Sequence, residues 1–481
     1  MGSTSRLVKN VIALWTPNIL NPAVSFILIL FISRYLGVEG LGTYSLILSY
    51  FGIFVTLAGL GLGTLVVREA ARNLGQAHTF FANAALFGAV SSLAAIIGMI
   101  AFVWLMGYSN DVLQAAVLCS FSLFPSTAVS YMESMFRAFE KAEYIAIVYL
   151  SENTLRVGSC LILLFYGFGI VPLFVAILGT RLFAGLFMFW CYVKALGRPE
   201  FRFKPEIWRL LGREAATFAS IAIFSTVHLH VDQIMLSKLK GLESVGIYSA
   251  ADRLLDFCRA LAVAFSAALF PVLAKQYVKG IGELRELTIR SLRYIMLGAI
   301  PIAIGTAILA NNIVTLIYGH KFMAAVPVLT LHIFSLIPFS MVYFLAGVLI
   351  VTDNQRVDLG INVLAALLNI GLNLVLIPHL AEMGSVLATL ITVIVFNQLQ
   401  NWYIKQRLFP IPFPELFSKV LLAGGIMGGV TFWLRDWNLL LNVAISAVVY
   451  TSLVVLLGAV TSNEIEAVKK IIKTPWAKEV P

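Results

Sequence analysis

Apolar stretches long enough to cross a membrane alternate with short polar connections along the whole chain. A helix of about 20 apolar residues spans a hydrocarbon core of roughly 30 Å, and the connections leave no room for a soluble domain. Fourteen apolar windows are found, near residues 10–33, 44–67, 81–106, 112–136, 144–166, 170–193, 215–237, 246–273, 294–317, 323–351, 358–378, 383–404, 416–434 and 438–460. The pattern predicts an all-α polytopic membrane protein with about 14 transmembrane helices.

Two short motifs occur twice in the same order, which indicates an internal duplication. GVEGLGTYS at 37–45 returns as GLESVGIYS at 241–249, and FSLFP at 121–125 returns as FSLIP at 334–338. Each copy would hold six helices, and an even number keeps both copies in the same orientation in the membrane. The duplication predicts a parallel repeat of two six-helix lobes plus two C-terminal helices. The expected divisions are a first lobe at 1–196, a basic cytoplasmic linker at 197–213, a second lobe at 214–408, and two extra helices with a basic tail at 409–481.

The basic residues gather on one side of this predicted topology. With the N-terminus inside, 25 of the 34 Lys and Arg residues fall in cytoplasmic segments, five in outer segments and four within spans. This bias follows the positive-inside rule, so we expect both termini in the cytoplasm and the chain in the plasma (inner) membrane. The net charge of +10 then indicates contact with membrane lipids of the cytoplasmic leaflet, and nucleic acid is not expected as a partner.

Composition and motifs favour a transporter and argue against an enzyme. Hydrophobic residues make up 60% of the chain and charged residues 12%, far from the balance of soluble domains. The four cysteines lie inside apolar runs and offer neither a metal-ligand spacing nor a disulfide framework. The sequence contains no phosphate-binding P-loop and no catalytic motif that we recognise. We therefore expect no cofactor and no metal, and leave Na⁺ or H⁺ open as a coupling ion.

The repeated glycine-tyrosine motif predicts a tight turn between two helices in each half. Its glycines can adopt positive φ angles, and its tyrosines suit a membrane interface. We expect these residues to set how each helical hairpin packs, with a direct role in gating as the alternative: Gly37, Gly42, Tyr44, Gly241, Gly246 and Tyr248.

Each FSL-[FI]-P motif places a proline inside a span. Pro125 and Pro338 each remove one helix hydrogen bond and are expected to kink their helices. A kink shared by both halves suits a cavity that opens to either side, although a packed, static kink fits the sequence equally well.

Charged residues inside the predicted spans are the sharpest functional signal. An ionised group at the bilayer centre costs at least about 2.5 kcal/mol, so such residues must face a protein interior or a watered cavity. The arginines are Arg156, Arg181, Arg253 and Arg259, and the acids are Glu133, Glu152, Asp232, Asp252 and Asp256. One interpretation is that they form structural pairs, such as Glu152 with Arg156 and Asp256 with Arg259. The other is a polar cavity whose arginines bind an anionic head group, because guanidinium suits phosphate.

The pair of histidines in the seventh span lies next to an acid. His228 and Asp232 are four residues apart and share a helix face, while His230 points elsewhere. Two such ligands do not make a metal site. Asp232 is a candidate for cation or proton coupling, and a hydrogen-bonded structural position is the alternative.

Four segments carry a resemblance to a known family. They are SRYLGVEGLGTYSLIL (33–48), VDQIMLSKLKGLESVGIYSAADRL (231–254), LIYGHKFMAAVPVLTLHIFSLIP (316–338) and LLNIGLNLVLIP (367–378). With them the chain resembles the polysaccharide-transporter branch, the O-antigen or lipid-linked oligosaccharide flippases, of the multidrug/oligosaccharidyl-lipid/polysaccharide exporter superfamily. One departure is the segment HLAEMGSVLAT after LIP, where the family usually has a G-x-x-G-A-A type pattern.

The resemblance implies two six-helix lobes that work by alternating access. It implies as substrate an oligosaccharide on a polyprenyl diphosphate, moved from the cytoplasmic to the outer leaflet for cell-surface polysaccharide biosynthesis. Only Asp232, Tyr248 and Arg253 are carried over, because they lie in a matching motif. Polysaccharide-assembly proteins are conceivable partners, and a monomer is expected because each chain holds both repeats.

Three alternatives are kept. A cation-coupled multidrug exporter of the same superfamily would favour embedded acids over arginines, and a peptidoglycan-precursor flippase would share the 14 helices. A membrane glycosyltransferase would need a large outer loop or a catalytic domain, which the sequence lacks. We also expect the last two helices to form a lateral groove for the polyprenyl tail. Deletion of residues 411–481 is then expected to abolish flipping while leaving the two lobes folded.

Overall fold

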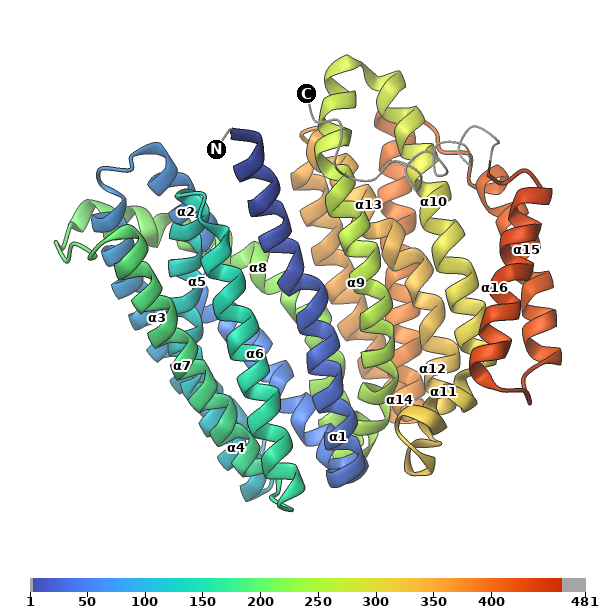
Figure 1. Ribbon diagram of the computed structural model, residues 1–481, viewed down its shortest axis with the longest axis horizontal. Coiled ribbons are helices and arrows are strands. Elements are labelled where there is room, and N and C mark those ends of the chain that lie inside the picture. The colour runs from blue at the N-terminus through green and yellow to red at the C-terminus, as the bar shows by residue number, and fades with distance from the viewer. Residues whose placement is uncertain (1–2, 461–481) are drawn as a thin grey trace. The chain divides into compact units, whose positions relative to one another are not determined.

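The computed structural model describes residues 3–460 of the chain, and helices form almost all of this range (Figure 1). A helix satisfies every backbone hydrogen bond within its own segment, which is why long apolar stretches adopt it in a membrane. In chain order the helices are α1 (Ser3–Gly59), α2 (Gly63–Arg72), α3 (Ala77–Leu105), α4 (Asn110–Phe121), α5 (Leu123–Ala138), α6 (Ala142–Phe165), α7 (Ile170–Leu196), α8 (Pro205–Leu239), α9 (Leu242–Lys279), α10 (Ile281–Ile308), α11 (Ala310–Ile317), α12 (Ala325–His332), α13 (Leu336–Val351), α14 (Gln355–Arg407), α15 (Phe413–Trp433) and α16 (Leu439–Leu456).

Eleven segments of the described chain are long and apolar enough to cross a membrane. Two of them, α1 and α14, contain a break in helical geometry, at Gly37 and Ala381, so each holds two spans. α8, with 35 residues, adds another helix of membrane-spanning length. The breaks fall between the predicted apolar windows, and the predicted all-α polytopic fold with about 14 transmembrane helices is confirmed.

Both copies of the FSL-[FI]-P motif interrupt a helix. Ser122 separates α4 from α5, and a short 3₁₀ turn at Ile333–Ser335 separates α12 from α13. Pro125 and Pro338 are each the third residue of the helix that follows. Because proline has no N–H, the carbonyl four residues earlier loses its helical partner, and the interruption falls at that point in both halves.

The chain divides into two compact units. Unit 1 comprises Met1–Arg253 and Asn362–Ala388, and unit 2 comprises Leu254–Ile361 and Thr389–Pro481. Within unit 1, α8 packs against α1 and α3, so the seventh span groups with the first six. The units therefore do not coincide with the expected lobes, whose boundaries stay a prediction about the sequence repeat.

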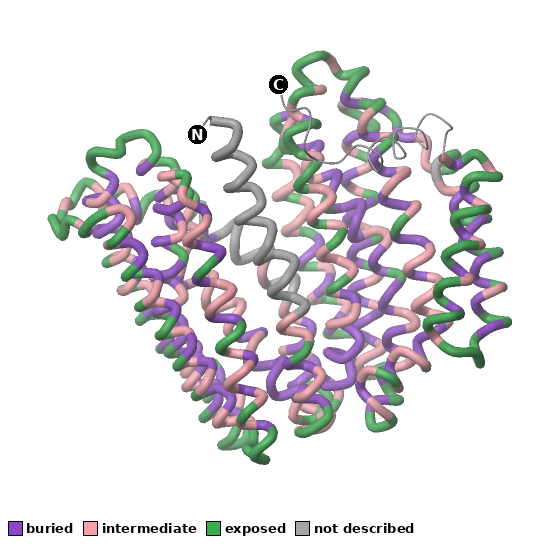
Figure 2. The backbone as a smooth tube through the Cα atoms, in the orientation of Figure 1, coloured by how far each residue is buried: buried purple, intermediate pink, exposed green. Residues whose placement is uncertain are grey.

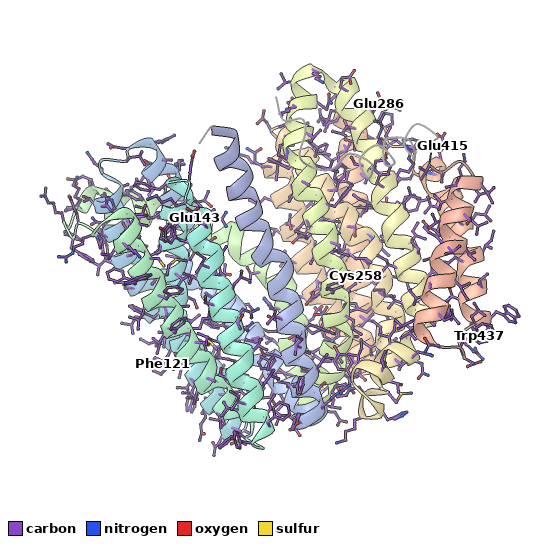
Figure 3. All side chains as sticks on the ribbon, viewed as in Figure 1. Phe121, Glu143, Cys258, Glu286, Glu415 and Trp437 are labelled. Atoms are coloured by element: carbon purple, nitrogen blue, oxygen red, sulfur yellow. The ribbon has the colours of Figure 1, made fainter. Side chains whose placement is uncertain are left out.

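Unit 1 has a core of aromatic and aliphatic side chains from α2, α3, α5, α6 and α7. Tyr131, Phe136 and Tyr192 are among its largest fully buried members. In Figure 2 buried positions run along the helices, while exposed positions lie at the connections and also along the outer sides of helices. Large apolar side chains also cover the outer faces. Phe121, labelled in Figure 3, is 50% exposed, as expected for a face that meets lipid rather than water.

The last two helices are part of the core of unit 2. Met427 of α15 and Tyr450 of α16 lie in one buried cluster with Met296 of α10 and Phe344 of α13. The Tyr450 hydroxyl donates a hydrogen bond to the carbonyl of Leu297 at 2.9 Å. Removing residues 411–481 would uncover this cluster. The expectation that the lobes fold without them stays a prediction, and this packing weighs against it.

Candidate functional site

Arg156 of α6 lies near the middle of its helix and is held by neutral groups. Its Nη2 donates to the side-chain oxygen of Asn153 at 2.6 Å and to the hydroxyl of Ser25, from α1, at 2.8 Å. Ser25 in turn donates to Asn153 at 3.2 Å. Among the described residues no carboxylate lies within ion-pair distance of Arg156. The guanidinium is thus oriented by two helices, and no carboxylate of the described residues compensates its charge.

Glu152 pairs with Arg181 of the neighbouring helix α7, which corrects the predicted pair of Glu152 with Arg156. The Arg181 Nη1 lies 2.9 Å from Glu152 Oε1 and 3.1 Å from Oε2. The guanidinium of Arg181 also lies 5.8 Å from the ring centre of Phe51, within cation–π range. Since Glu152 is buried, this ion pair fixes α6 against α7, and Arg181 is neutralised by its partner.

The charged residues of α9 fall into two groups. In unit 2, Arg259 Nη1 lies 3.2 Å from Asp256 Oδ1, as the three-residue spacing predicts, and its guanidinium is 5.0 Å from the ring centre of Phe339. In unit 1, Asp252 is buried and Arg253 is half-buried, and both have interaction partners. Arg253 and Arg259 are therefore placed by α9 but are not free cations.

Asp232 of α8 is buried in a hydrogen-bonded network. Its Oδ2 accepts from the Tyr248 hydroxyl at 3.0 Å, and its Oδ1 accepts from the Asn373 amide at 2.7 Å. The same amide nitrogen donates to Asn369 Oδ1 at 3.1 Å. The oxygen of Asn373 and the amide nitrogen of Asn369 are buried without a hydrogen-bond partner in the described part of the chain. The network thus brings together three helices of unit 1 around one carboxylate.

The other polar candidates lie elsewhere. The side chain of His228 lies outside the described residues, and the ring of His230 packs against Gly52. Glu133 accepts from Arg137 at 2.5 Å and from the Tyr149 hydroxyl at 2.7 Å, a pair near the end of α5. Within the range that the structure describes, no group of three or more His, Cys, Asp or Glu could hold a metal ion.

The glycine-tyrosine motifs form a reciprocal helix crossing, which corrects part of their prediction. Gly37 and Gly241 do have positive φ, at 70° and 92°, but Gly42 and Gly246 are helical. A Cβ atom on Gly42 would overlap the carbonyl oxygen of Leu242, and one on Gly246 would overlap that of Val38. These two glycines are therefore needed for close approach of the two helix starts rather than for turning the chain.

The tyrosines of the motif are core residues. Tyr44 and Tyr248 are each 3% exposed, so they do not line a membrane interface as expected. Tyr248 reaches Asp232, as described above, and Tyr44 packs against Phe174 with ring centres 5.9 Å apart.

Unit 2 contains an apolar cavity of about 480 Å³ between α10, α15 and α16. Gly298, Pro301 and Gly305 line it from α10, and Met427 and Ala447 line it from the last two helices. Pro301 and the two glycines leave room that larger side chains would fill. The cavity is shared by α10 and the last two helices, and the lateral groove expected at these helices stays a prediction.

Several polar residues of these sites escaped the sequence analysis because they carry no charge. Ser25, Asn153 and Asn369 give no signal of charge in an apolar span. Asn369 and Asn373 do stand four residues apart within the quoted segment LLNIGLNLVLIP, a spacing that places both on one helix face. That spacing could have marked the two asparagines as a polar pair in the sequence. Only the packing of the helices shows that the pair lies next to Asp232.

Comparison with known families gives one match that covers more than half of the chain. The family model described as "Polysaccharide biosynthesis protein" matches residues 7–276. This range contains Arg156, Arg181, Asp232 and both glycine-tyrosine motifs.

Two curated proteins share parts of this sequence. The "Probable lipid II flippase MurJ" of Haemophilus influenzae is 27% identical over 266 residues, which cover 49% of this chain and 52% of that protein. The "Teichuronic acid biosynthesis protein TuaB" of Bacillus subtilis is 22% identical over 143 residues, 30% of this chain and 29% of that one. The chain thus aligns with about half of the first relative's length and less of the second's.

Solved structures share the fold. The lipid II flippase MurJ in an inward closed conformation superposes with a TM-score of 0.79 at 16% identity, covering 96% of this chain and 100% of that one. An inward-facing multidrug resistance MATE family transporter of the MOP superfamily gives a TM-score of 0.65 at 15% identity, covering 82% of this chain and 98% of its own. At these identities the likeness shows the fold alone.

Proposed function

The chain belongs to the polysaccharide biosynthesis protein family, and on this premise we propose that it flips a polyprenyl-diphosphate-linked oligosaccharide from the cytoplasmic to the outer leaflet by alternating access. Arg156 is the observation that carries the proposal. Its guanidinium is oriented near the middle of α6 by Ser25 and Asn153, with no carboxylate of the described residues in ion-pair distance. A diphosphate would supply the missing negative charge, with charge-assisted and bidentate hydrogen bonds to guanidinium. A cationic drug would meet repulsion at this position, which weighs against drug export.

A peptidoglycan precursor is the second candidate for the substrate. The name of the Haemophilus influenzae relative favours it. Both candidates share a polyprenyl diphosphate, so Arg156 serves either one equally. The sugar portion is what distinguishes them, and assays must therefore vary it.

Transport in proteoliposomes tests the proposal directly. The purified protein is reconstituted with a fluorescent polyprenyl-diphosphate-linked sugar, a peptidoglycan precursor, or an organic cation, in separate vesicles. Flipping of the linked oligosaccharide in preference to the precursor supports the proposal. Preference for the precursor makes the second candidate correct. If only the cation is moved, against a sodium or proton gradient, both flippase candidates are wrong.

For coupling we propose Na⁺ at Asp232, with H⁺ as the alternative ion. The two orientations of a side-chain amide fill the same space. Rotating the Asn373 amide by half a turn would place its oxygen where its nitrogen now lies. This oxygen would then lie about 2.7 Å from Asp232 Oδ1 and about 3.1 Å from Asn369 Oδ1, between the two other oxygens. Oxygen ligands with one negative charge suit a hard cation such as Na⁺.

Asp232→Asn should remove sodium stimulation and lower flipping by about tenfold or more, because a charged hydrogen-bonding partner is lost. Flipping rates are measured with sodium, with potassium, and with an imposed pH gradient. Ser49→Ala is the matched control. It removes a buried hydrogen bond of 2.6 Å to Gln233, the residue after Asp232, but leaves the oxygens of Asp232, Asn369 and Asn373 in place. Equal sodium stimulation in Asp232→Asn and wild type would contradict the site, and dependence on pH alone would assign H⁺.

We further propose that the cavity of unit 2 accepts part of the polyprenyl tail. Its lining is apolar, and burying hydrocarbon gives about 0.8 kcal/mol per CH₂. A Cβ at Gly305 would have no atom within 4 Å, so a larger side chain there enters open space without disturbing the helix.

Gly305→Phe should lower flipping of a long-chain substrate by about tenfold and leave a short-chain analogue unaffected, because the ring occupies space used by the tail. Paired flipping assays with the two chain lengths measure this ratio. Gly429→Phe is the control, since Gly429 lies on an exposed face of α15 and does not line the cavity. Equal losses for both chain lengths would reject the cavity as the tail site.

A further inference from the structure

A short non-helical segment, residues 197–204, joins α7 to α8 and is clamped to α3 by a buried amide. Asn83, 2% exposed, donates to the backbone carbonyl of Arg202 at 2.8 Å and accepts from the backbone N–H of Lys204 at 3.0 Å. It also donates to the carbonyl of Thr79 at 2.9 Å. The amide thus holds the segment at two points, and this part of the chain has a defined position although it lacks helical hydrogen bonds.

The clamp holds two phenylalanines in exposed positions. Phe201 is 77% exposed and Phe203 is 63% exposed. The Phe203 ring contacts Trp208 of α8 with centres 5.5 Å apart, and Leu86 of α3, itself largely exposed, lines a small hollow with both phenylalanines. Exposed aromatic rings have a lower free energy in the interfacial layer of a bilayer than in water, so rings fixed in this way favour contact with that layer.

The same stretch is basic and begins at the membrane surface. Residues 197–213 contain five Lys or Arg and two Glu, and one of these, Glu200, accepts from the Thr79 hydroxyl at 3.1 Å. In the last turns of α7, Lys194 Nζ lies 4.8 Å from the ring centre of the exposed Trp190. A Trp–Lys pair near the end of a span marks the headgroup layer, so the segment that follows lies at that depth.

We propose that residues 197–213 form a lipid-binding strap whose occupants are anionic phospholipid headgroups of the adjacent leaflet. The phenylalanine rings enter the interfacial layer. The exposed Arg198, which precedes them, and the exposed Arg202, which lies between them, bind headgroup phosphates. The excess of positive charge selects anionic over zwitterionic lipid, because each basic residue near such a surface adds attraction. This binding concerns the bilayer and is independent of the transported substrate.

A fluorescence experiment on the full chain tests the strap. The four native cysteines are replaced by alanine, Phe201 is changed to Cys, and an environment-sensitive label is attached. The protein is placed in nanodiscs with increasing phosphatidylglycerol in phosphatidylcholine, with nitroxide-bearing lipids as quenchers near the headgroup. We expect quenching to rise with the phosphatidylglycerol fraction. Arg198→Gln with Arg202→Gln should weaken the apparent lipid affinity about tenfold.

Two further variants separate the strap from general effects of charge and folding. Arg285→Gln with Arg290→Gln removes the same charge from exposed positions on α10 and should leave quenching unchanged. Asn83→Ala keeps every charge but removes the clamp and should lower quenching in phosphatidylglycerol. Quenching that is equal in both lipids, or no quenching at all, overturns the proposal. Protection of the label only in native membranes would assign the surface to a protein partner and would overturn it as well.

Discussion

Arg156→Ala should lower flipping of a polyprenyl-diphosphate-linked sugar by about a hundredfold, with folding retained. The loss follows from removing a charge-assisted contact to a phosphate that no carboxylate of the described chain replaces. The flipping rate of Arg156→Lys should lie between those of wild type and Arg156→Ala, because lysine keeps the charge but lacks the planar, bidentate guanidinium. Proteoliposome flipping rates measure the effect, and thermal unfolding in detergent checks that the variants are folded.

The neighbouring ion pair provides the matched control for this prediction. Glu152→Gln combined with Arg181→Gln removes one positive and one negative charge at a similar depth and leaves the net charge of unit 1 unchanged. Flipping by this double variant should stay within about threefold of wild type, because replacing a buried pair by neutral groups is often nearly neutral. Arg181→Gln alone should instead destabilise the protein, since Glu152 stays buried without its partner. A normal flipping rate in Arg156→Ala would show that the arginine is structural.

Gly42→Ala and Gly246→Ala should each destabilise the protein by about 1–3 kcal/mol and reduce flipping. The added methyl group would overlap a backbone carbonyl oxygen, which is fixed within its helix. To accommodate the methyl group, α1 near Gly42 and the start of α9 would have to move apart. Thermal unfolding and flipping measure the two effects independently. Gly→Ala in an exposed helical position normally stabilises, so the sign of the change is itself informative.

Glycines in open surroundings serve as controls for the crossing. Gly158 of α6 and Gly179 of α7 are helical, and a Cβ at either would have no atom within 4 Å. Gly158→Ala and Gly179→Ala should unfold at or above the wild-type temperature and flip normally. If Gly42→Ala behaves like these controls, the close approach at the crossing is not required for stability or transport.

The position and number of the membrane spans were readable from the sequence. The apolar windows matched the helices because a membrane admits few alternatives to a helix for an apolar stretch of this length. The windows near 10–33 and 44–67 even anticipated the break of α1 at Gly37. The repeated motifs likewise predicted paired features, since Pro125 and Pro338 each follow an interruption of their helix.

The partners of the embedded charges were predicted less well. Spacing along one helix favoured Glu152 with Arg156, but Glu152 reaches Arg181 on the next helix and Arg156 is left with Ser25 and Asn153. Spacing correctly paired Asp256 with Arg259, where the two residues share a turn. A pattern within one helix contains no information about how a neighbouring helix is rotated, and that rotation decides between partners.

Local sequence patterns determine some features of this protein, and the packing of the helices determines the others. Hydrophobic length, proline position and positive φ at glycine are local properties, so the spans, their interruptions and the Gly37 and Gly241 turns can be derived residue by residue. The close approach at Gly42 and the network around Asp232 join segments up to 204 and 141 residues apart. Such contacts depend on how whole helices cross, so they emerge only when the helices are packed together.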